Sequence, residues 1–123
     1  MRRDMDLIRS ILMACEMTPA GRHLCASDIT VGDATRDSIV QHAVLLLEEQ
    51  LLVGRHLTAL SLDDEDVVIQ RLTWQGHDFI AAARDEATWQ AGKTAAKKVG
   101  DVSFSVLKEI LSAFAKERLG LPG

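Results

Sequence analysis

The sequence predicts an α+β protein, a winged-helix-like domain followed by an extra C-terminal amphipathic helix. Three observations predict this class: a helical apolar stripe near the N-terminus, a more apolar helix around residue 42, and two β-prone runs across a polar turn. Helix, short strand, helix, β-hairpin and helix is the order of a winged helix, whose recognition helix precedes the hairpin or wing. We expect this domain over residues 1–100 and the separate helix over residues 101–123.

The first predicted helix begins after Asp4, a suitable N-cap, and ends at the breaker residues 18–21. A short strand is expected at residues 29–31, because a β-branched run there precedes a Gly-Asp turn. The interval from residue 18 to 34 leaves little room for the further helix of a full winged helix. That helix is therefore degenerate or replaced by the short strand. The apolar stripe of the first helix consists of Leu7, Ile8, Ile11, Leu12 and Cys15.

The predicted recognition helix spans about residues 35–50, with Asp33 or Thr35 as its N-cap. Its apolar residues cover more than half of the circumference, so we expect it to pack on more than one side. The β-prone runs at residues 51–53 and 57–60, and then at 67–72, predict a hairpin. The polar turn at residues 61–66 is the expected wing tip.

Two further helices are expected after the hairpin. Thr73 caps a helix over about residues 74–91, with Phe79, Ile80, Ala83 and Ala87 facing inward and Gly92 just beyond it.

The last helix spans about residues 103–118 and ends at the stop signal of residues 119–122. Burial of its five apolar side chains is worth roughly 1.5–3 kcal/mol each before entropy. We expect this stripe to pack on its own domain or on a second copy, and we prefer a homodimer. Its members are Val106, Leu107, Ile110, Leu111 and Phe114.

The composition is that of a globular protein, with 47% hydrophobic and 26% charged residues. Uninterrupted apolar runs, such as residues 43–47, are far too short to cross a bilayer, and no signal-like apolar segment follows the N-terminus. We therefore expect a cytoplasmic protein with no membrane partner. In a reducing compartment Cys15 and Cys25 are expected to be small buried side chains rather than a disulfide.

The net charge of −4 is unevenly distributed. Residues 1–83 carry seven Lys and Arg against thirteen Asp and Glu, whereas residues 84–123 carry seven against five. A protein that only coats nucleic acid is expected to be basic throughout. The charge therefore disfavours non-specific binding to nucleic acid.

Polar residues near the start of the predicted recognition helix are nevertheless suited to double-stranded DNA. Arginine and glutamine can read base edges in the major groove, and serine can hold a phosphate. Two arginines on the hairpin are placed to reach the flanking backbone. The candidate DNA contacts are Arg36, Ser38, Gln41, His42, Arg55 and Arg71.

The acidic run Asp63-Asp64-Glu65-Asp66 at the wing tip argues against DNA, because phosphates repel it. A solvated turn is the commoner interpretation of such a run. If DNA is bound, we expect this tip to point away from it.

No catalytic or cofactor motif is present. His77 lies beside Asp78, but adjacent helical residues point in different directions, so Asp78 cannot orient His77 as a general base. Instead we expect Trp74 and His77 to fix the junction between hairpin and helix, with Gly76 allowing close packing.

The only set for a metal, His23 and Cys25 with Cys15 and His42, lacks the close pair of a zinc site. We expect no enzyme, no metal, no cofactor and no small-molecule substrate.

Two segments, Arg3-Asp4-Met5-Asp6-Leu7-Ile8-Arg9 and Leu72-Thr73-Trp74-Gln75-Gly76-His77-Asp78-Phe79, are distinctive together. With them the chain resembles an uncharacterised family of short bacterial and prophage proteins, a domain of unknown function. The likeness continues through Trp89 and residues 97–100 to residues 119–121, and Gln50 stands where the family has glycine. The resemblance implies a winged-helix-like fold and a bacterial or phage origin, but no activity.

The leading prediction is a non-enzymatic bacterial or prophage accessory protein that binds DNA or regulates transcription. The alternative is a protein-interaction adaptor that uses the winged-helix scaffold without binding DNA. The acidic wing tip and the negative net charge favour the alternative.

Overall fold

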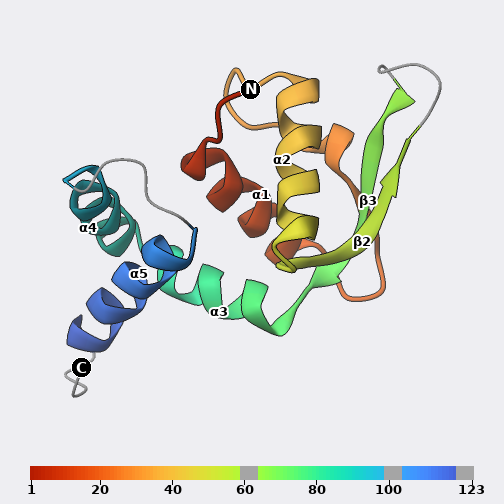
Figure 1. The fold of residues 1–123 in the computed structure, drawn as a ribbon. Helices are drawn as coiled ribbons and strands as arrows, with labels where there is room; N and C mark the ends of the chain where they lie inside the picture. The colour runs from red at the N-terminus through yellow and green to blue at the C-terminus, as the bar shows by residue number, and fades with distance from the viewer. Residues whose placement is uncertain (59–63, 99–103, 119–123) are drawn as a thin grey trace. The chain divides into compact units, whose positions relative to one another are not determined.

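The computed structural model describes residues 1–58, 64–98 and 104–118 and confirms an α+β protein with a winged-helix-like arrangement (Figure 1). Its contacts cluster into two units, Met1–His77 and Asp78–Gly123, and each is described by itself. The boundary predicted at residues 100–101 lies outside the described residues. The elements are α1 (Met5–Met17), β1 (Leu24–Cys25), η1 (Ala26–Asp28), α2 (Arg36–Glu48), β2 (Leu52–Leu57), β3 (Asp66–Leu72), α3 (Trp74–Ala83), α4 (Glu86–Lys97) and α5 (Phe104–Arg118).

Helix α1 forms as the sequence predicts. The Asp4 carboxylate accepts hydrogen bonds from the backbone N–H groups of Asp6 and Leu7, at 3.0 and 3.2 Å, which satisfies two donors of the first turn. The helix ends at Thr18, before a proline that cannot continue it. All five residues of its predicted apolar stripe are buried.

The predicted strand at residues 29–31 is wrong. Ile29 is buried and has an extended backbone, but strand β1 lies earlier, where Leu24 pairs with Ile69 and Cys25 with Val68. A single turn of 3-10 helix, η1, then occupies the place of the missing winged-helix helix. The register with β3, which local β propensity does not encode, decides which residues form the strand.

Of the two predicted caps of α2, Thr35 is the one that the helix uses, since its hydroxyl accepts a hydrogen bond from the Ser38 N–H at 3.1 Å. It ends in a Schellman motif: Leu51 N–H donates to the Leu46 carbonyl at 3.0 Å and Gln50 N–H to the Leu47 carbonyl at 3.1 Å. This motif places Gln50 in the left-handed region, at φ 63°. Glycine adopts that conformation without a steric penalty, so the glycine that the family resemblance leads us to expect there fits the backbone.

The hairpin completes a three-stranded antiparallel sheet of order β1-β3-β2. Strand β2 pairs with β3 from Leu52↔Leu72 to Leu57↔Asp66, with an irregularity at Val53 and Gly54. A Cβ atom at position 54 would overlap the Val68 carbonyl oxygen, so glycine allows this close approach. The predicted strand residues 59 and 60 and the wing-tip residues 61–63 lie outside the described residues.

The core of the first unit lies between α1, α2 and the sheet. Helix α1 contacts both α2 and β3, and α2 contacts η1 and the hairpin (Figure 1). Side chains from all of these elements are fully buried, among them Leu12, Leu46 and Ile69. The prediction that α2 packs on more than one side is confirmed.

The single helix predicted over residues 74–91 is wrong, because the chain forms α3 and α4 with a break at Arg84 and Asp85. Asp85 is the N-cap of α4, and its carboxylate accepts from the Thr88 N–H and hydroxyl, each at 2.9 Å. Phe79, Ile80 and Ala83 are buried as predicted, whereas Ala87 is exposed. The Asp85 cap therefore starts a separate helix, in which Ala87 is exposed.

Helix α4 also continues through Gly92, which was expected to lie beyond it. Gly92 is buried, and a Cβ atom there would lie 2.6 Å from Leu111 Cδ2, so the absence of a side chain lets α4 and α5 approach closely. Trp89 is buried in the same unit and meets Phe79 edge to face at 6.4 Å between ring centroids.

Helix α5 uses only part of its predicted stripe within this unit. Leu107 and Leu111 are buried, Ile110 and Phe114 are half-buried, and Val106 is 40% exposed. Its predicted first residue, 103, and the predicted stop signal at 119–122 lie outside the described residues. Among the described helices, none combines the length and the hydropathy that a membrane span requires.

Candidate functional site

His42 is a structural residue of the core rather than a surface contact. Its side chain is 0% exposed. The Asp4 N–H donates to Nε2 at 2.9 Å, and Nδ1 lies 2.7 Å from the Ser38 carbonyl oxygen, to which it donates. Both ring nitrogens are therefore used to tie the start of α1 to α2, and none faces a ligand.

Glu65, at the base of the wing, binds the other long polar residues at the start of α2. Arg36 Nη2 donates to the Glu65 carbonyl oxygen at 2.7 Å, and Gln41 Nε2 donates to Glu65 Oε1 at 2.5 Å. Arg36 Nη1 also lies 3.6 Å from the Asp37 carboxylate. Two of the four α2 candidates for DNA contact, Arg36 and Gln41, thus donate hydrogen bonds within the domain.

The same Glu65 carboxylate also joins the two strands of the wing. His56 Nε2 lies 2.6 Å from Glu65 Oε2, and the Glu65 side chain is only 19% exposed. A charged acceptor this well hydrogen-bonded is a structural group. The interpretation of the acidic run as a solvated turn is therefore wrong for Glu65.

Asp66 is the second structural acid of the wing. Ser27 donates to it from the backbone N–H at 3.1 Å and from the hydroxyl at 2.5 Å, and Val67 N–H donates at 2.8 Å. Partial burial alone raises the pKa of Asp66, but these hydrogen bonds and the charge of Arg36 together hold that pKa below its ordinary value. Of the predicted acidic tip, Asp64 is exposed and Asp63 lies outside the described residues.

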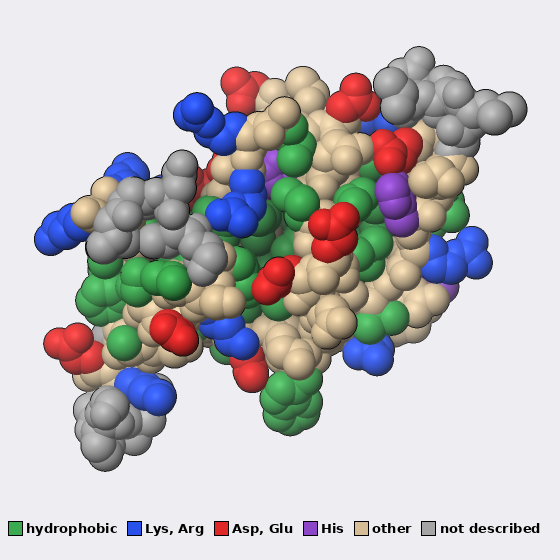
Figure 2. Space-filling view, viewed as in Figure 1, with side chains coloured by type: hydrophobic (Ala, Val, Ile, Leu, Met, Phe, Trp, Pro, Cys, Tyr) green, Lys and Arg blue, Asp and Glu red, His purple; other side chains and the backbone are tan. Residues whose placement is uncertain are grey.

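Exposed acidic side chains lie at both ends of α2. Asp37, Glu48 and Glu49 are exposed, while Ser38 and Gln41 are half-buried. Figure 2 shows scattered acidic side chains and no continuous basic patch on the face that it displays. The phosphates of a DNA duplex would meet negative charge at both ends of this helix.

Arg55 and Arg71 lie on the hairpin as predicted and are exposed. Arg55 is on β2 opposite Val68, and Arg71 is on β3 opposite Val53. The Arg71 guanidinium donates to the Leu72 carbonyl oxygen at 3.1 Å. The six candidate DNA contacts therefore fall into two groups. Arg55 and Arg71 on the hairpin are exposed. Arg36, Gln41 and His42 on α2 instead make hydrogen bonds within the domain.

The junction between hairpin and α3 is structural. The Thr73 hydroxyl donates to the Gln50 carbonyl oxygen at 2.7 Å and accepts from Gly76 N–H at 3.0 Å. A Cβ atom on Gly76 would overlap the Leu51 carbonyl oxygen, which agrees with the expected close packing. Trp74 does not fix the junction by burial, since it is 80% exposed.

Cys15 is buried as expected, whereas Cys25 is only half-buried. Both are free thiols. Burial raises the pKa of the Cys15 thiol to about 12, and burial with the nearby Asp66 and Asp28 charges raises the pKa of Cys25. Within the described residues no three His, Cys, Asp or Glu side chains gather as a metal site.

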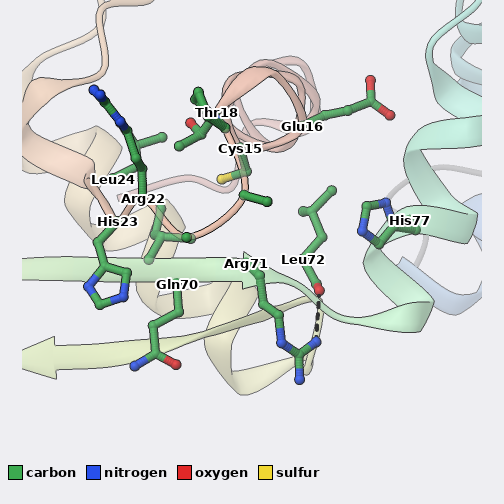
Figure 3. A pocket seen from close by; sticks show the side chains of 14 residues that line it. Cys15, Glu16, Thr18, Arg22, His23, Leu24, Gln70, Arg71, Leu72 and His77 are labelled. Carbon is green, nitrogen blue, oxygen red and sulfur yellow. Dashed lines mark hydrogen bonds between the residues drawn. The ribbon is translucent and has the colours of Figure 1, made fainter.

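A cleft of about 530 Å³ opens between residues 18–24 and the end of β3 (Figure 3). Cys15, Leu24, Ile69 and Leu72 contribute its apolar lining. Cationic or titratable side chains surround it, namely Arg22, His23, Arg71 and His77, all of them exposed.

The cleft could not be predicted from the sequence, because its residues come from three separate segments that the β1–β3 register brings together. The contacts of Glu65 with Arg36, Gln41 and His56 were not predicted either. The sequence held a signal for these contacts. Glu65 lies at the base of the predicted wing, and the predicted recognition helix begins with the hydrogen-bond donors Arg36 and Gln41.

The fold and its α2–wing junction define a winged-helix-like protein. The chain belongs to the family described as hypothetical protein (DUF2513), which it matches over residues 2–102. It is 29% identical over 120 residues to an uncharacterized protein of Haemophilus influenzae (strain ATCC 51907 / DSM 11121 / KW20 / Rd), covering 97% of this chain and 99% of that protein. No solved structure matches it. The predicted resemblance to a domain of unknown function is confirmed.

Proposed function

We propose that this protein is a winged-helix protein-interaction module that does not read DNA through α2. One observation carries the proposal: Glu65 accepts hydrogen bonds from both Gln41 and Arg36, the two α2 residues best suited to base edges. To reach DNA, Gln41 would have to leave a carboxylate that is only 19% exposed, and Arg36 would have to leave a backbone carbonyl oxygen.

Electrostatics supports the same proposal. The unit that contains α2 and the wing carries seven arginines, no lysine and twelve acids. Three of those acids are exposed, Asp37 and Glu48 on α2 and Glu49 as its C-cap. Phosphate contacts supply most of the affinity of DNA-binding domains, so this surface disfavours DNA at the outset.

Exposed Trp74 supports a protein partner. Large aromatic side chains are rarely left 80% exposed, and tryptophan is enriched among the residues that dominate protein–protein binding. Its neighbour Gln75 is exposed on the same first turn of α3. We propose that Trp74 is an anchor for the partner.

The first test measures fluorescence anisotropy of a labelled random duplex at low and high salt. We expect no salt-sensitive binding by the natural chain in the micromolar range, where non-specific DNA binding lies. The variant Glu48→Lys with Glu49→Lys is the positive control, since it replaces two exposed acids on α2 and should gain weak, salt-sensitive binding. Salt-sensitive binding by the natural chain that Arg36→Ala with Gln41→Ala weakens would contradict the proposal.

The second test compares Trp74→Ala with the matched variant Gln75→Ala in affinity purification from a bacterial host. We expect a protein that co-purifies with the natural chain and with Gln75→Ala but not with Trp74→Ala. Both side chains are exposed, so unfolding temperatures should agree for all three. Retention of the same proteins by all three would remove Trp74 from the proposal.

DNA binding through the wing is the second candidate, because the fold is winged-helix-like and Arg55 is exposed on β2. This candidate predicts that Arg55→Glu abolishes any duplex binding while Arg36→Ala leaves it unchanged. The anisotropy assay therefore distinguishes the wing from α2.

The proposal includes a cytoplasmic, non-enzymatic protein that self-associates through α5. Free Cys15 and Cys25 support a reducing compartment. The exposed part of Val106, beside half-buried Ile110 and Phe114, supports an apolar contact between two copies. Light scattering should then give twice the chain mass for the natural protein and the single mass for Val106→Glu.

A further inference from the structure

One edge of the sheet is open beside the cleft. Strand β1 pairs with β3 only at Leu24↔Ile69 and Cys25↔Val68, although β3 continues to Leu72. The described residues therefore place no strand beside residues 70–72 on that side. An unpaired edge is a template for another strand.

The chain before β1 turns away from this edge. Arg22 N–H donates to the Pro19 carbonyl at 3.1 Å, and Gly21 has φ 83°, a conformation that favours glycine. Residues 20–23 would extend β1 along β3, but this turn removes them from the register. The cleft of about 530 Å³ occupies the place that a longer β1 would fill.

The charge around the cleft is opposite to that of the rest of the unit. In Figure 3, Arg22 and His23 lie at one end and Arg71 and His77 at the other. Glu16 is the single acid among the fourteen lining residues, and its carboxylate extends away from Arg22. The two arginines belong to a unit in which acids outnumber basic residues, so a generally basic surface does not account for them.

The partner chemistry follows from these three features. An open strand edge offers backbone groups, the apolar lining accepts alternate side chains, and the guanidinium groups bind carboxylates. We propose that an extended acidic segment of a protein partner adds as a strand to β3 at residues 70–72. Its acidic side chains bind Arg22 and Arg71, and its intervening apolar side chains contact Leu24 and Leu72.

Arg71 is poised at this edge. Its guanidinium has five N–H donors, and one of them donates to the Leu72 carbonyl oxygen. The next residue, Thr73, donates its N–H on the β2 side, to the Leu51 carbonyl oxygen, so the Leu72 carbonyl faces the open edge and an incoming backbone N–H replaces the guanidinium there. The released guanidinium then meets an acidic side chain of the same segment.

This inference rests on the proposed protein-interaction function and names its partner class. The probe is an eight-residue peptide of alternating glutamate and valine, blocked at both ends and labelled for fluorescence anisotropy. A peptide with glutamine in place of glutamate tests the charge. A peptide with one central proline tests the strand, because proline removes a backbone donor.

We expect the acidic peptide to bind the natural chain at least fivefold more tightly than either control peptide. Arg22→Ala with Arg71→Ala should weaken binding at least tenfold. The matched control is Arg55→Ala, an equally exposed arginine on the same sheet outside the cleft, and it should leave binding unchanged. Circular dichroism of each variant should equal that of the natural chain.

Equal binding of acidic and neutral peptides, or equal loss with Arg55→Ala, would overturn the cleft as the site. If the natural chain binds neither the acidic peptide nor duplex DNA, this inference alone is overturned and the proposed function stands. Duplex binding that Arg22→Ala with Arg71→Ala abolishes would overturn both, since the cleft would then bind a phosphate backbone.

Discussion

The α2–wing junction and the β1–β3 cleft use charged and polar residues in opposite ways. At the junction, the Glu65 carbonyl oxygen accepts a hydrogen bond from Arg36, and its carboxylate binds Gln41 and His56. At the cleft, Arg22 and Arg71 surround an open strand edge with one acid among the lining residues. Gln41 and His56 are structural because a carboxylate of the domain binds them, whereas Arg22 and Arg71 are exposed beside the cleft.

The largest expected effect of a single substitution is at His42. His42→Ala removes a fully buried ring with two hydrogen bonds, and should lower the free energy of unfolding by about 3 kcal/mol. Chemical denaturation measures it. A stability within 0.5 kcal/mol of the natural chain, roughly the scatter of surface substitutions, would contradict the structural role.

Glu65→Ala should have the next largest effect. It leaves Gln41 and His56 without their acceptor, and should cost about 1–2 kcal/mol in the same measurement. Asp64→Ala is the matched control, because Asp64 is an exposed acid next to it, and should change stability little. If both variants behaved alike, Glu65 would be part of a solvated turn after all.

The ionisation of Asp66 makes the free energy of unfolding depend on pH. Its pKa is lower in the folded chain than the ordinary value near 3.9, so its stabilising contribution is present above that value. The contribution is lost as the pH falls through the folded-state pKa. Asp66→Asn should therefore flatten the acid limb of unfolding curves measured between pH 5 and 2. An unchanged acid limb would show that the Ser27 hydrogen bonds do not favour the ionised carboxylate.

The smallest expected effect is a gain. Gln50→Gly should raise the free energy of unfolding by about 0.5–1 kcal/mol, because relief of the left-handed conformation exceeds the added chain entropy of the unfolded state. Gln50→Ala keeps the strain and should bring no gain. Equal stability of both variants would show that the conformation costs little at this position.

Local sequence signals predicted the elements that depend on local chemistry. Asp4 was identified as a cap and Thr35 as one of two candidate caps, the stripe of α1 as buried, and the hairpin from its two β-prone runs. Each of these depends on residues within one turn or one strand. The family resemblance, carried by two short motifs, was likewise confirmed by a match over residues 2–102.

Features that depend on long-range register were not predicted. The strand at residues 24–25 is selected by β3, more than forty residues away, over a run with higher β propensity. The break before α4 was missed although Asp85 and Thr88 form a typical cap, because apolar spacing appeared to continue through it. The cleft and the Glu65 contacts join distant segments in the same way.

An amide NMR titration of the isotopically labelled chain with the blocked acidic peptide tests the central claim most directly. The account predicts shift changes at residues 20–24 and 69–72, with residues 36–48 of α2 unchanged. Changes confined to α2, with the cleft silent, would contradict it and restore α2 as the binding surface.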